Sequence, residues 1–367
     1  MQINNCVIAV VFGGVSNENE ISVITGTMAA NVLKTGGVHV LPVYVEQSGE
    51  FFAGEELLKL NTYKQKNFKK CNKAIFAYGG VYLLNGRGRI KKHVKVDCVL
   101  NCCHGGWGEG GGLSGVCAAA GVPLAGAGTF ESAAFMDKYL TKTVLAGLGV
   151  RVAPYRYVRP NCRDMCGFPY PLIVKPVSLG SSIGIQKVED GEELKSALDC
   201  AFIYDSAAIV EKYLEPRREI NCAAYYAGDE VFVSECEEAI TSGDILSFED
   251  KYQGGGKSVI PADIPAEIST YIRQTTRTVY EKLNMRGIVR FDYILSDEVY
   301  LSEINTVPGS LAYYLFAKSF KDFFGVLEGV ILQAQKDFAR SRKKLLTTGI
   351  LQNIPENSVK SSRKCAE

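Results

Sequence analysis

Two short stretches near the C-terminal end carry side chains whose types and spacing suit phosphoryl-group chemistry. The segment GIVRFDYILSDEVYLSEIN, residues 287–305, alternates in polarity around a short turn, which predicts a β-hairpin. Side chains two residues apart on a strand share a face, so Arg290 is paired with Asp292 on the first strand. On the second strand, Glu303 is paired with Asn305 in the same way.

The register between these two strands decides which side chains lie opposite each other and so what the hairpin can bind. A four-residue loop over 296–299 would set Asp292 opposite Glu303 and bring all four side chains onto one face. Two facing carboxylates repel unless a cation lies between them, and with an amide oxygen they suit Mg²⁺ shared with nucleotide phosphates. A nearby arginine suits the oxygens of a transferring phosphoryl group. The alternative is a solvated sheet face with a cross-strand ion pair.

A second segment could bind phosphate. The sequence LIVKPVSLGSSIGIQKV, residues 172–188, places Lys175 on a strand before a loop that contains Gly180 and Ser181. Glycines let backbone N–H groups approach a phosphate closely, serines add hydroxyl donors and the lysine adds charge. The sequence has neither GxxxxGK[ST] nor a GxGxxG after a strand. Without its neighbours the loop would be an ordinary turn.

A third segment could bind the rest of a nucleotide. In IVEKYLEPRREIN, residues 209–221, the end of an apolar strand could present backbone groups and Glu211 to an adenine edge. Glu219 follows eight residues later, and a carboxylate commonly holds a ribose diol. The alternative is a pair of surface glutamates.

These candidates require elements that position them, and the N-terminal part predicts a parallel α/β domain. An apolar strand over 7–12 leads through glycines into a helix over 21–33. A second apolar strand over 96–103 leads into the glycine-dense HGGWGEGGGLSG. Ligands bind at the carboxyl ends of parallel strands, so the loops 13–20 and 104–115 are expected to face one crevice.

The pattern changes near residue 129, where a second domain is expected to start. One helix is predicted from Thr129, as its N-cap, to a stop at Gly147 and Gly149. Strands over 171–177 and 185–188 then predict a hairpin around the glycine–serine loop. The polar end of the chain predicts a frayed tail.

Composition narrows the class of protein. A chain of 367 residues with 47% hydrophobic and 22% charged residues predicts two or three globular domains with a ligand cleft between them. The net charge of +1 is too small to attract nucleic acid or anionic lipid to the protein surface as a whole. The apolar N-terminal stretch is too short to span a membrane and lacks signal-peptide features. We therefore expect a cytoplasmic protein that binds neither nucleic acid nor membrane.

The twelve cysteines are scattered along the chain, which favours reduced thiols. The close groupings are Cys102-Cys103-His104, and Cys162 with Cys166. Neither has the paired spacing of a zinc site, so buried small apolar side chains are the favoured interpretation and metal binding the alternative.

Together, these segments resemble the D-alanine–D-alanine ligase family of the ATP-grasp superfamily. Each motif is weak alone, but they occur in the order of that family from about residue 7 to residue 315. The motifs that carry the resemblance are FGGVSNENEIS at 12–22, HGGWGEGGGLSG at 104–115, MDKYLTK at 136–142, VKPVSLGSSIG at 174–184, EKYLEPRREI at 211–220, FEDKY at 248–252, VRFDYI at 289–294 and SEINTVPGS at 302–310.

The resemblance implies an α/β and α+β fold with three-domain ATP-grasp architecture. The expected units are an N-terminal Rossmann-like parallel α/β domain over 1–127, a central α+β lid domain over 128–211 and a C-terminal α+β domain over 212–346. This C-terminal domain would carry the metal and acceptor sites. Residues 347–367 are expected to form a flexible tail.

The resemblance also implies a reaction. ATP would phosphorylate the carboxylate of a first D-alanine, and the amine of a second D-alanine would displace phosphate, as in peptidoglycan precursor synthesis. Such a site needs cations, Mg²⁺ (two ions, with Mn²⁺ as an alternative) and a closing lid to exclude water. A homodimer is the expected assembly.

Residue roles follow from the matched motifs. Catalytic roles are implied for Glu18, Ser181, Tyr252, Arg290 and Gly309. Substrate binding is implied for His104, Ser310 and Tyr314. ATP binding is implied for Lys138, Lys175, Glu211, Tyr213, Leu214, Glu219 and Lys251, and metal binding for Asp292, Glu303 and Asn305.

The chain departs from the family pattern at the expected acceptor site. Ser310 and Tyr314 stand where the family usually has a methionine and a serine that binds the second substrate's carboxylate. Gly110 replaces a usual acidic residue, and the lid segment lacks a tyrosine. A tyrosine hydroxyl can still donate to a carboxylate, although its ring needs more room. Two alternatives stay open, namely a ligase for another acceptor such as D-serine or D-lactate, and a catalytically silent nucleotide-binding homologue.

Overall fold

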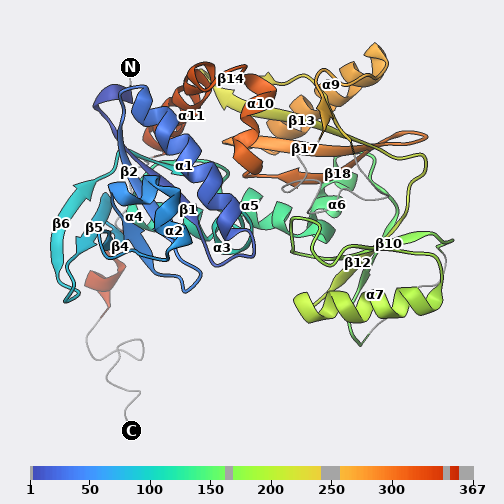
Figure 1. Ribbon diagram of the computed structural model, residues 1–367, viewed down its shortest axis with the longest axis horizontal. Coiled ribbons are helices and arrows are strands. Elements are labelled where there is room, and N and C mark those ends of the chain that lie inside the picture. The colour runs from blue at the N-terminus through green and yellow to red at the C-terminus, as the bar shows by residue number, and fades with distance from the viewer. Residues whose placement is uncertain (1–2, 162–167, 241–256, 342–347, 355–367) are drawn as a thin grey trace, which may run out of the picture.

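The computed structural model describes residues 3–161, 168–240, 257–341 and 348–354. The strands of this described part form three sheets, which follow one another along the chain (Figure 1). The first sheet is mixed and the second and third are antiparallel. This arrangement confirms the predicted combination of an α/β unit with α+β units.

The first sheet is built around β1 (Val7–Gly13), an apolar strand buried on both faces. It pairs in parallel with β2 (His39–Val45) and β7 (Cys98–Asn101), and β7 pairs in parallel with β8 (Leu124–Ala125). The strands at the other edge pair in antiparallel fashion, because short turns rather than helical crossovers connect most of them. The sequence analysis did not predict this edge. These edge strands are β3 (Phe51–Ala53), β4 (Asn72–Ala77), β5 (Gly80–Leu84) and β6 (Ile90–Lys95).

Helices cover the first sheet. Helix α1 (Asn19–Thr35) follows β1 and lies beside the C-terminal helix α11 (Phe320–Ser341) (Figure 1). The two helices share one apolar core, to which Leu33 and Phe323 contribute fully buried side chains. Two helices that are far apart in the sequence therefore bury their apolar side chains in the same core. Smaller helices of this region are η1 (Ile3–Asn5), η2 (Glu55–Leu58), α2 (Leu60–Lys64), α3 (Gly106–Glu109) and α4 (Gly112–Ala120).

The second sheet has the strand order β11-β10-β12-β9, with helix α7 (Gly191–Tyr204) packed on it. The predicted hairpin around the glycine–serine loop is confirmed, because Leu172 pairs with Val188 in antiparallel register. The strands are β9 (Tyr155–Val158), β10 (Leu172–Pro176), β11 (Gln186–Val188) and β12 (Ala208–Lys212).

The third sheet has the strand order β16-β15-β13-β17-β18, and β14 pairs with the far end of β13. Helix α9 (Ala266–Lys282) covers it with buried side chains such as Ile272 and Tyr280. The strands are β13 (Arg218–Ala227), β14 (Glu230–Val233), β15 (Glu237–Ala239), β16 (Ser258–Val259), β17 (Ile288–Leu295) and β18 (Val299–Asn305). After β18 come η3 (Gly309–Ala312) and α10 (Tyr313–Phe316), and η4 (Ile350–Asn353) lies near the end of the described chain.

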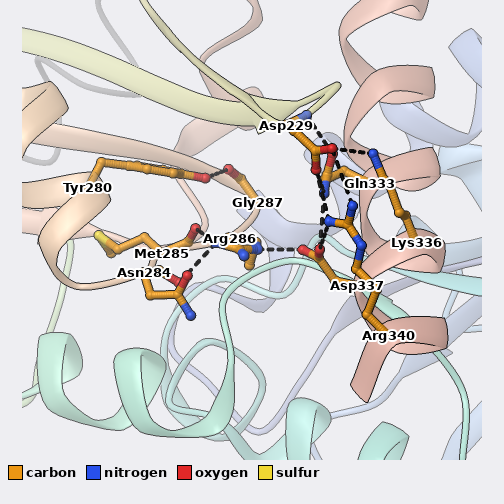
Figure 2. Close-up of polar contacts among 10 residues, drawn as sticks. All are labelled: Asp229, Tyr280, Asn284, Met285, Arg286, Gly287, Gln333, Lys336, Asp337 and Arg340. Carbon is orange, nitrogen blue, oxygen red and sulfur yellow. Dashed lines mark hydrogen bonds and ion pairs between the residues drawn. The ribbon is translucent and has the colours of Figure 1, made fainter. Parts of the chain in front are cut away.

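Polar side chains tie α11 to this third unit. Gln333 on α11 is buried and bonds Asp229 at the β13–β14 turn, and Asp337 on α11 accepts from Arg286 (Figure 2). Helix α11 thus packs on the first sheet through apolar side chains and is linked to the third sheet by these polar contacts as well as by apolar ones.

The helix predicted from Thr129 to Gly147 is two helices, α5 (Thr129–Met136) and α6 (Lys138–Gly147). Gly128, not Thr129, is the N-cap of α5. Asp137 interrupts the helix in an extended conformation, and its carboxylate accepts from the backbone of Leu140. The break is therefore an N-cap for the second helix.

Two broader expectations concern membranes and cysteines. Within the described residues, no helix has both the length and the apolar character that a membrane crossing requires. Cys102 and Cys103 are buried, and burial raises the pKa of both thiols. No group of three His, Cys, Asp or Glu side chains suited to a metal occurs in the described part of the chain, and Cys162 and Cys166 lie outside it.

Candidate active site

One cavity of about 400 Å³ is lined by side chains and backbone from the N-terminal unit, the glycine–serine loop and the third sheet. Glu18 and His104 both line it, so the predicted common crevice of the two N-terminal loops is confirmed. The other expected site residues in its lining are Lys138, Ser181, Arg290, Asp292, Glu303, Asn305, Gly309, Ser310 and Tyr314.

The β17–β18 hairpin has the predicted facing of its polar residues. Arg290 lies opposite Asn305, and Asp292 opposite Glu303. The loop is three residues rather than four, because Leu295 pairs directly with Val299. A bulge between Asp292 and Tyr293 adds one residue to the second strand and restores the expected register.

Arg290 and Asp292 form a two-point ion pair. Nε of Arg290 donates to Oδ1 of Asp292 at 2.7 Å and Nη2 donates to Oδ2 at 2.9 Å. Burial disfavours the guanidinium charge, but Asp292 outweighs burial and the pKa of Arg290 is raised well above its usual value. Asn305 donates to Asp292 at 2.9 Å. The arginine and the carboxylate are thus held together in the lining of the cavity.

The oxygens of this hairpin suit Mg²⁺. Asp292, Glu303 and Asn305 all line the cavity, so two carboxylates and one amide oxygen face the same space. Mg²⁺ is commonly held by one or two carboxylates while substrate phosphates and water supply its other ligands. Lys138 lies 3.5 Å from Glu303, which places a cation beside the same carboxylate. The donor set therefore fits a metal–nucleotide complex and does not need a third acidic ligand.

The glycine–serine loop closes on the N-terminal unit. The Ser181 hydroxyl donates to Glu18, and a Cβ at Gly180 would lie only 2.7 Å from a Glu18 oxygen. Ser181 and Ser182 have φ of 53° and 60°, in the left-handed region. Lys138 reaches the same loop by donating to the carbonyl of Leu179. The loop therefore needs a small residue at 180 to approach Glu18.

Lys175 and Glu211 meet in the interior, together with a residue that the sequence analysis missed. Glu211 lies 3.1 Å from Lys175 and 3.3 Å from Lys142, and all three are buried. Burial raises the pKa of Glu211, but the two lysines outweigh it and lower that pKa to about 2. Lys142 follows Lys138 by four residues on α6, and this helical spacing was the available signal.

Several residues expected at the nucleotide lie outside the lining of this cavity. Tyr213 and Leu214 are buried, and Glu219 accepts from Arg217. Lys175 and Glu211 are paired with each other as described above. The nucleotide roles of these residues stay predictions. Lys251 and Tyr252 lie outside the described residues.

His104 is held at both ring nitrogens by protein atoms. Nδ1 lies 2.8 Å from the carbonyl of Val307 and Nε2 lies 2.7 Å from the Thr25 hydroxyl. Burial lowers the pKa of His104 to about 4, so the ring is neutral at pH 7. A carbonyl can only accept, so Nδ1 carries the proton and Nε2 accepts from Thr25. His104 therefore contacts the loop after β18 directly, and its contact with a substrate stays a prediction.

Glu109 joins the same two regions. Its carboxylate accepts from the backbone N–H of Gly105 at 2.7 Å and of Val307 at 3.2 Å. Burial and the nearby Glu18 raise the pKa of Glu109 to about 8, against the lowering effect of these hydrogen bonds. Glu109 lines the cavity and was missed as a site residue.

Tyr314 lines the cavity together with two buried polar residues, Asn221 and Glu237, that were also missed. Burial raises the pKa of Tyr314 to about 12, against the lowering effect of Arg290. Its hydroxyl is therefore a donor at neutral pH. Asn221 donates to Glu237 at 3.0 Å, and both line the cavity. Asn221 ends the quoted segment 209–221, but its contact with Glu237 depends on the pairing of β13 with β15, which the local sequence does not specify.

The fold and the site together define an ATP-grasp ligase. The structure resembles that of the D-alanine–D-alanine ligase from Helicobacter pylori, with a TM-score of 0.74, 28% identity and coverage of 93% of this chain and 100% of the other. It also resembles the VanG D-Ala:D-Ser ligase from Enterococcus faecalis, with a TM-score of 0.76, 29% identity and coverage of 89% and 99%.

Sequence comparison identifies the family. The "D-ala D-ala ligase N-terminus" family matches residues 7–127 and the "D-ala D-ala ligase C-terminus" family matches residues 147–327. A D-alanine–D-alanine ligase of Thermosipho melanesiensis is 33% identical over 94% of this chain and 98% of its own length. The chain belongs to the D-alanine–D-alanine ligase family.

Proposed function

We propose that the protein uses ATP to join two molecules of D-alanine into D-alanyl-D-alanine, for the synthesis of peptidoglycan precursors. The proposal rests on family membership along most of the chain and on one observation in the cavity. That observation is the common face of Arg290, Asp292, Glu303 and Asn305. A catalytically silent homologue would not need both carboxylates and the arginine in this arrangement.

The reaction has two steps. A carboxylate oxygen of the first D-alanine attacks the γ-phosphorus of ATP, so ADP leaves and an acyl phosphate forms. The amine of the second D-alanine then attacks the carbonyl carbon and loses a proton, and phosphate leaves with the transferred oxygen. The cavity must neutralise phosphoryl charge and exclude water from the acyl phosphate.

Residues at the N-terminal side of the cavity would hold the first D-alanine. Glu18 would bind its ammonium group, and Ser181 would lie over its carboxylate. Lys138 and Lys175 would contact the ATP phosphates, because lysine is a mobile point charge. Two contacts support these assignments. Ser181 donates a hydrogen bond to Glu18, and Lys138 lies beside Glu303.

The remaining nucleotide contacts follow from the family resemblance. Adenine contacts are proposed for Glu211, Tyr213 and Leu214, a ribose contact for Glu219, and closure of the site for Lys251 and Tyr252. An adenine contact would require Glu211 to rearrange locally, because its carboxylate is paired with two lysines.

Asp292, Glu303 and Asn305 would hold Mg²⁺, as two ions, with Mn²⁺ as a substitute. Bound there, the metal would supply positive charge for the phosphate oxygens. Arg290 and the backbone N–H of Gly309 would stabilise the oxyanion that develops when the amine attacks. Release of Arg290 from Asp292 would make its donors available for this purpose.

The acceptor side is the part of the site that departs from the family pattern. Ser310 and Tyr314 would bind the carboxylate of the second substrate, with the protonated Tyr314 hydroxyl as the donor. D-Serine or D-lactate is the alternative acceptor. The likeness to the VanG D-Ala:D-Ser ligase is the observation that favours testing D-serine.

We further propose three broader properties. The enzyme works in the cytoplasm, where ATP and reduced thiols are available. It assembles as a homodimer, as is usual in the family. Its division into domains at residues 127, 211 and 346 separates a first-substrate domain, a lid domain and a metal- and acceptor-binding domain.

One assay separates these alternatives. Phosphate and dipeptide are measured with MgATP and D-alanine alone, and then with D-alanine plus a panel of second D-amino and D-hydroxy acids. We expect D-alanine alone to give equal amounts of phosphate and D-alanyl-D-alanine. Turnover only with a mixed pair would contradict D-alanine as the second substrate. Absence of turnover with every pair would contradict the proposal that the protein is a ligase.

A further inference from the structure

Three consecutive residues beside the cavity adopt a backbone conformation that their side chains disfavour. Ser310, Leu311 and Ala312 have φ of 50°, 50° and 47°, and none of them is glycine. The left-handed conformation is unfavourable for an L-residue with a side chain, so neighbouring contacts must hold this turn. Part of the support is apolar, because Leu311 and Ala312 are buried in the core shared by α1 and α11.

The other part of the support is a single buried hydroxyl. The backbone N–H of Ser310 donates to Oγ1 of Thr25 at 3.1 Å, and Thr25 is fully buried in the middle of α1. The same oxygen lies 2.7 Å from Nε2 of His104. Since Nδ1 of His104 donates to the carbonyl of Val307, Thr25 donates its hydroxyl proton to Nε2 and accepts from Ser310.

This hydrogen-bond chain joins the two sides of the active site. Thr25 lies within α1, seven residues after Glu18, which is the N-cap residue of the same helix. The left-handed turn that Thr25 holds lies between Gly309 and Tyr314, which line the acceptor end of the cavity. Thr25 itself does not line the cavity.

We propose that Thr25 is a positioning residue for the second substrate. Its hydroxyl fixes the turn at Ser310 and thereby sets the places of the Gly309 N–H and of the Tyr314 hydroxyl, without touching a reactant. This role rests on the proposed function. Loss of the hydroxyl leaves Ser310 N–H and His104 Nε2 without their partner in a buried site, and the turn is then free to relax.

The defect that this predicts is selective. The side chains proposed for the first D-alanine and ATP, namely Glu18, Ser181, Lys138 and Lys175, are not part of the Thr25–His104–Ser310 chain, so acyl phosphate still forms when Thr25 is changed. The acceptor amine is captured less often, and water attacks the acyl phosphate instead, which returns D-alanine and phosphate. Phosphate release then exceeds dipeptide formation.

The test compares Thr25→Val, which removes the hydroxyl at nearly constant volume, with Thr25→Ser, which keeps it. Phosphate and dipeptide are measured in the same reactions while ATP and D-alanine are varied. For Thr25→Val we expect the KM for the second D-alanine to rise about tenfold, which is the loss of one good hydrogen bond. We also expect a phosphate-to-dipeptide ratio above one and a KM for ATP within about twofold of wild type.

The conservative variant keeps the proposal testable if Thr25→Val does not fold. Thr25→Ser should retain the wild-type ratio and KM for the second D-alanine, and an acceptor defect in this variant would contradict the role of the hydroxyl. Equal increases of the KM values for ATP and D-alanine in Thr25→Val, or no change in either, would also contradict it. A wild-type enzyme that forms no dipeptide would instead contradict the proposed function.

Discussion

Arg290 donates two hydrogen bonds to the carboxylate of Asp292, two residues further along the same strand. Both side chains point into the cavity, where one is expected to stabilise an oxyanion and the other to bind metal. The two charges therefore neutralise each other within the pair. Binding of a metal–nucleotide complex would separate them and give each its own partner.

Replacement of Arg290 tests this relationship. Arg290→Ala should lower dipeptide formation by at least about a hundredfold, since a preorganised donor to a developing oxyanion is lost. Nucleotide binding, measured by titration calorimetry, should stay within a few-fold of wild type. Arg277→Ala, at an exposed position on α9, is the control and should keep full activity. Loss of nucleotide binding together with activity would show that Arg290 is needed for the structure of the site.

The buried ion group of Lys142, Lys175 and Glu211 makes a prediction about stability. Lys142→Met leaves Glu211 with one lysine, and the free energy of unfolding should fall by about 3 kcal/mol, as is typical when a buried ion pair is broken. The exposed Lys212 is the neighbour of Glu211 in the chain, so Lys212→Met is a matched control with an expected effect below about 0.5 kcal/mol. Urea denaturation measures both. Equal effects would mean that Lys142 does not stabilise Glu211.

His104 predicts how stability depends on pH. An unfolded histidine takes up a proton below about pH 6.5, whereas the pKa of about 4 keeps the folded His104 neutral until lower pH. The unfolded state therefore binds more protons in this range, so stability is fully present above pH 6.5 and is lost as pH falls toward 4.

The variant His104→Asn isolates this contribution, because asparagine retains a donor but does not titrate. Between pH 7 and pH 5 the free energy of unfolding of the wild type should fall by about 2 kcal/mol more than that of the variant. Urea denaturation at both pH values gives the two differences. Parallel pH dependence of the two proteins would contradict a buried neutral histidine.

The anchoring of α11 gives a fourth prediction. Gln333 is buried and makes hydrogen bonds to Asp229 and Asp337, whereas Lys336 makes an exposed ion pair with Asp229 (Figure 2). Gln333→Leu should lower the free energy of unfolding by about 2 kcal/mol, because the hydrogen bonds of a buried amide to Asp229 and Asp337 are lost. Lys336→Ala should cost less than about 1 kcal/mol. The reverse order in thermal or urea unfolding would contradict this account of the network.

The hairpin shows how far the sequence could predict the site. The alternation of polar residues fixed which side chains share a face, and this depends only on the period of a strand. The loop length was one residue too long, and the bulge between Asp292 and Tyr293 was not foreseen. The shorter loop and the bulge shift the register in opposite directions, so Asp292 still lies opposite Glu303 as predicted. A bulge reflects the packing of the strand in its sheet, which local sequence does not specify.

Contacts between distant segments were beyond the sequence pattern. Thr25 and Ser310 are 285 residues apart, and Thr25 looked like an ordinary helical residue. Lys142 was likewise hidden, since its partner Glu211 lies on another element. His104 and Glu18 could be placed at one crevice because both follow parallel strands or their turns, and the carboxyl ends of such strands meet at one edge.

The transfer of the phosphoryl group to D-alanine is tested most directly by following an oxygen atom. D-Alanine labelled with ¹⁸O in its carboxylate is incubated with MgATP and the enzyme, and the products are analysed by mass spectrometry. An acyl phosphate predicts one labelled oxygen in each phosphate released, together with ADP and D-alanyl-D-alanine. Unlabelled phosphate, or label in AMP, would contradict it.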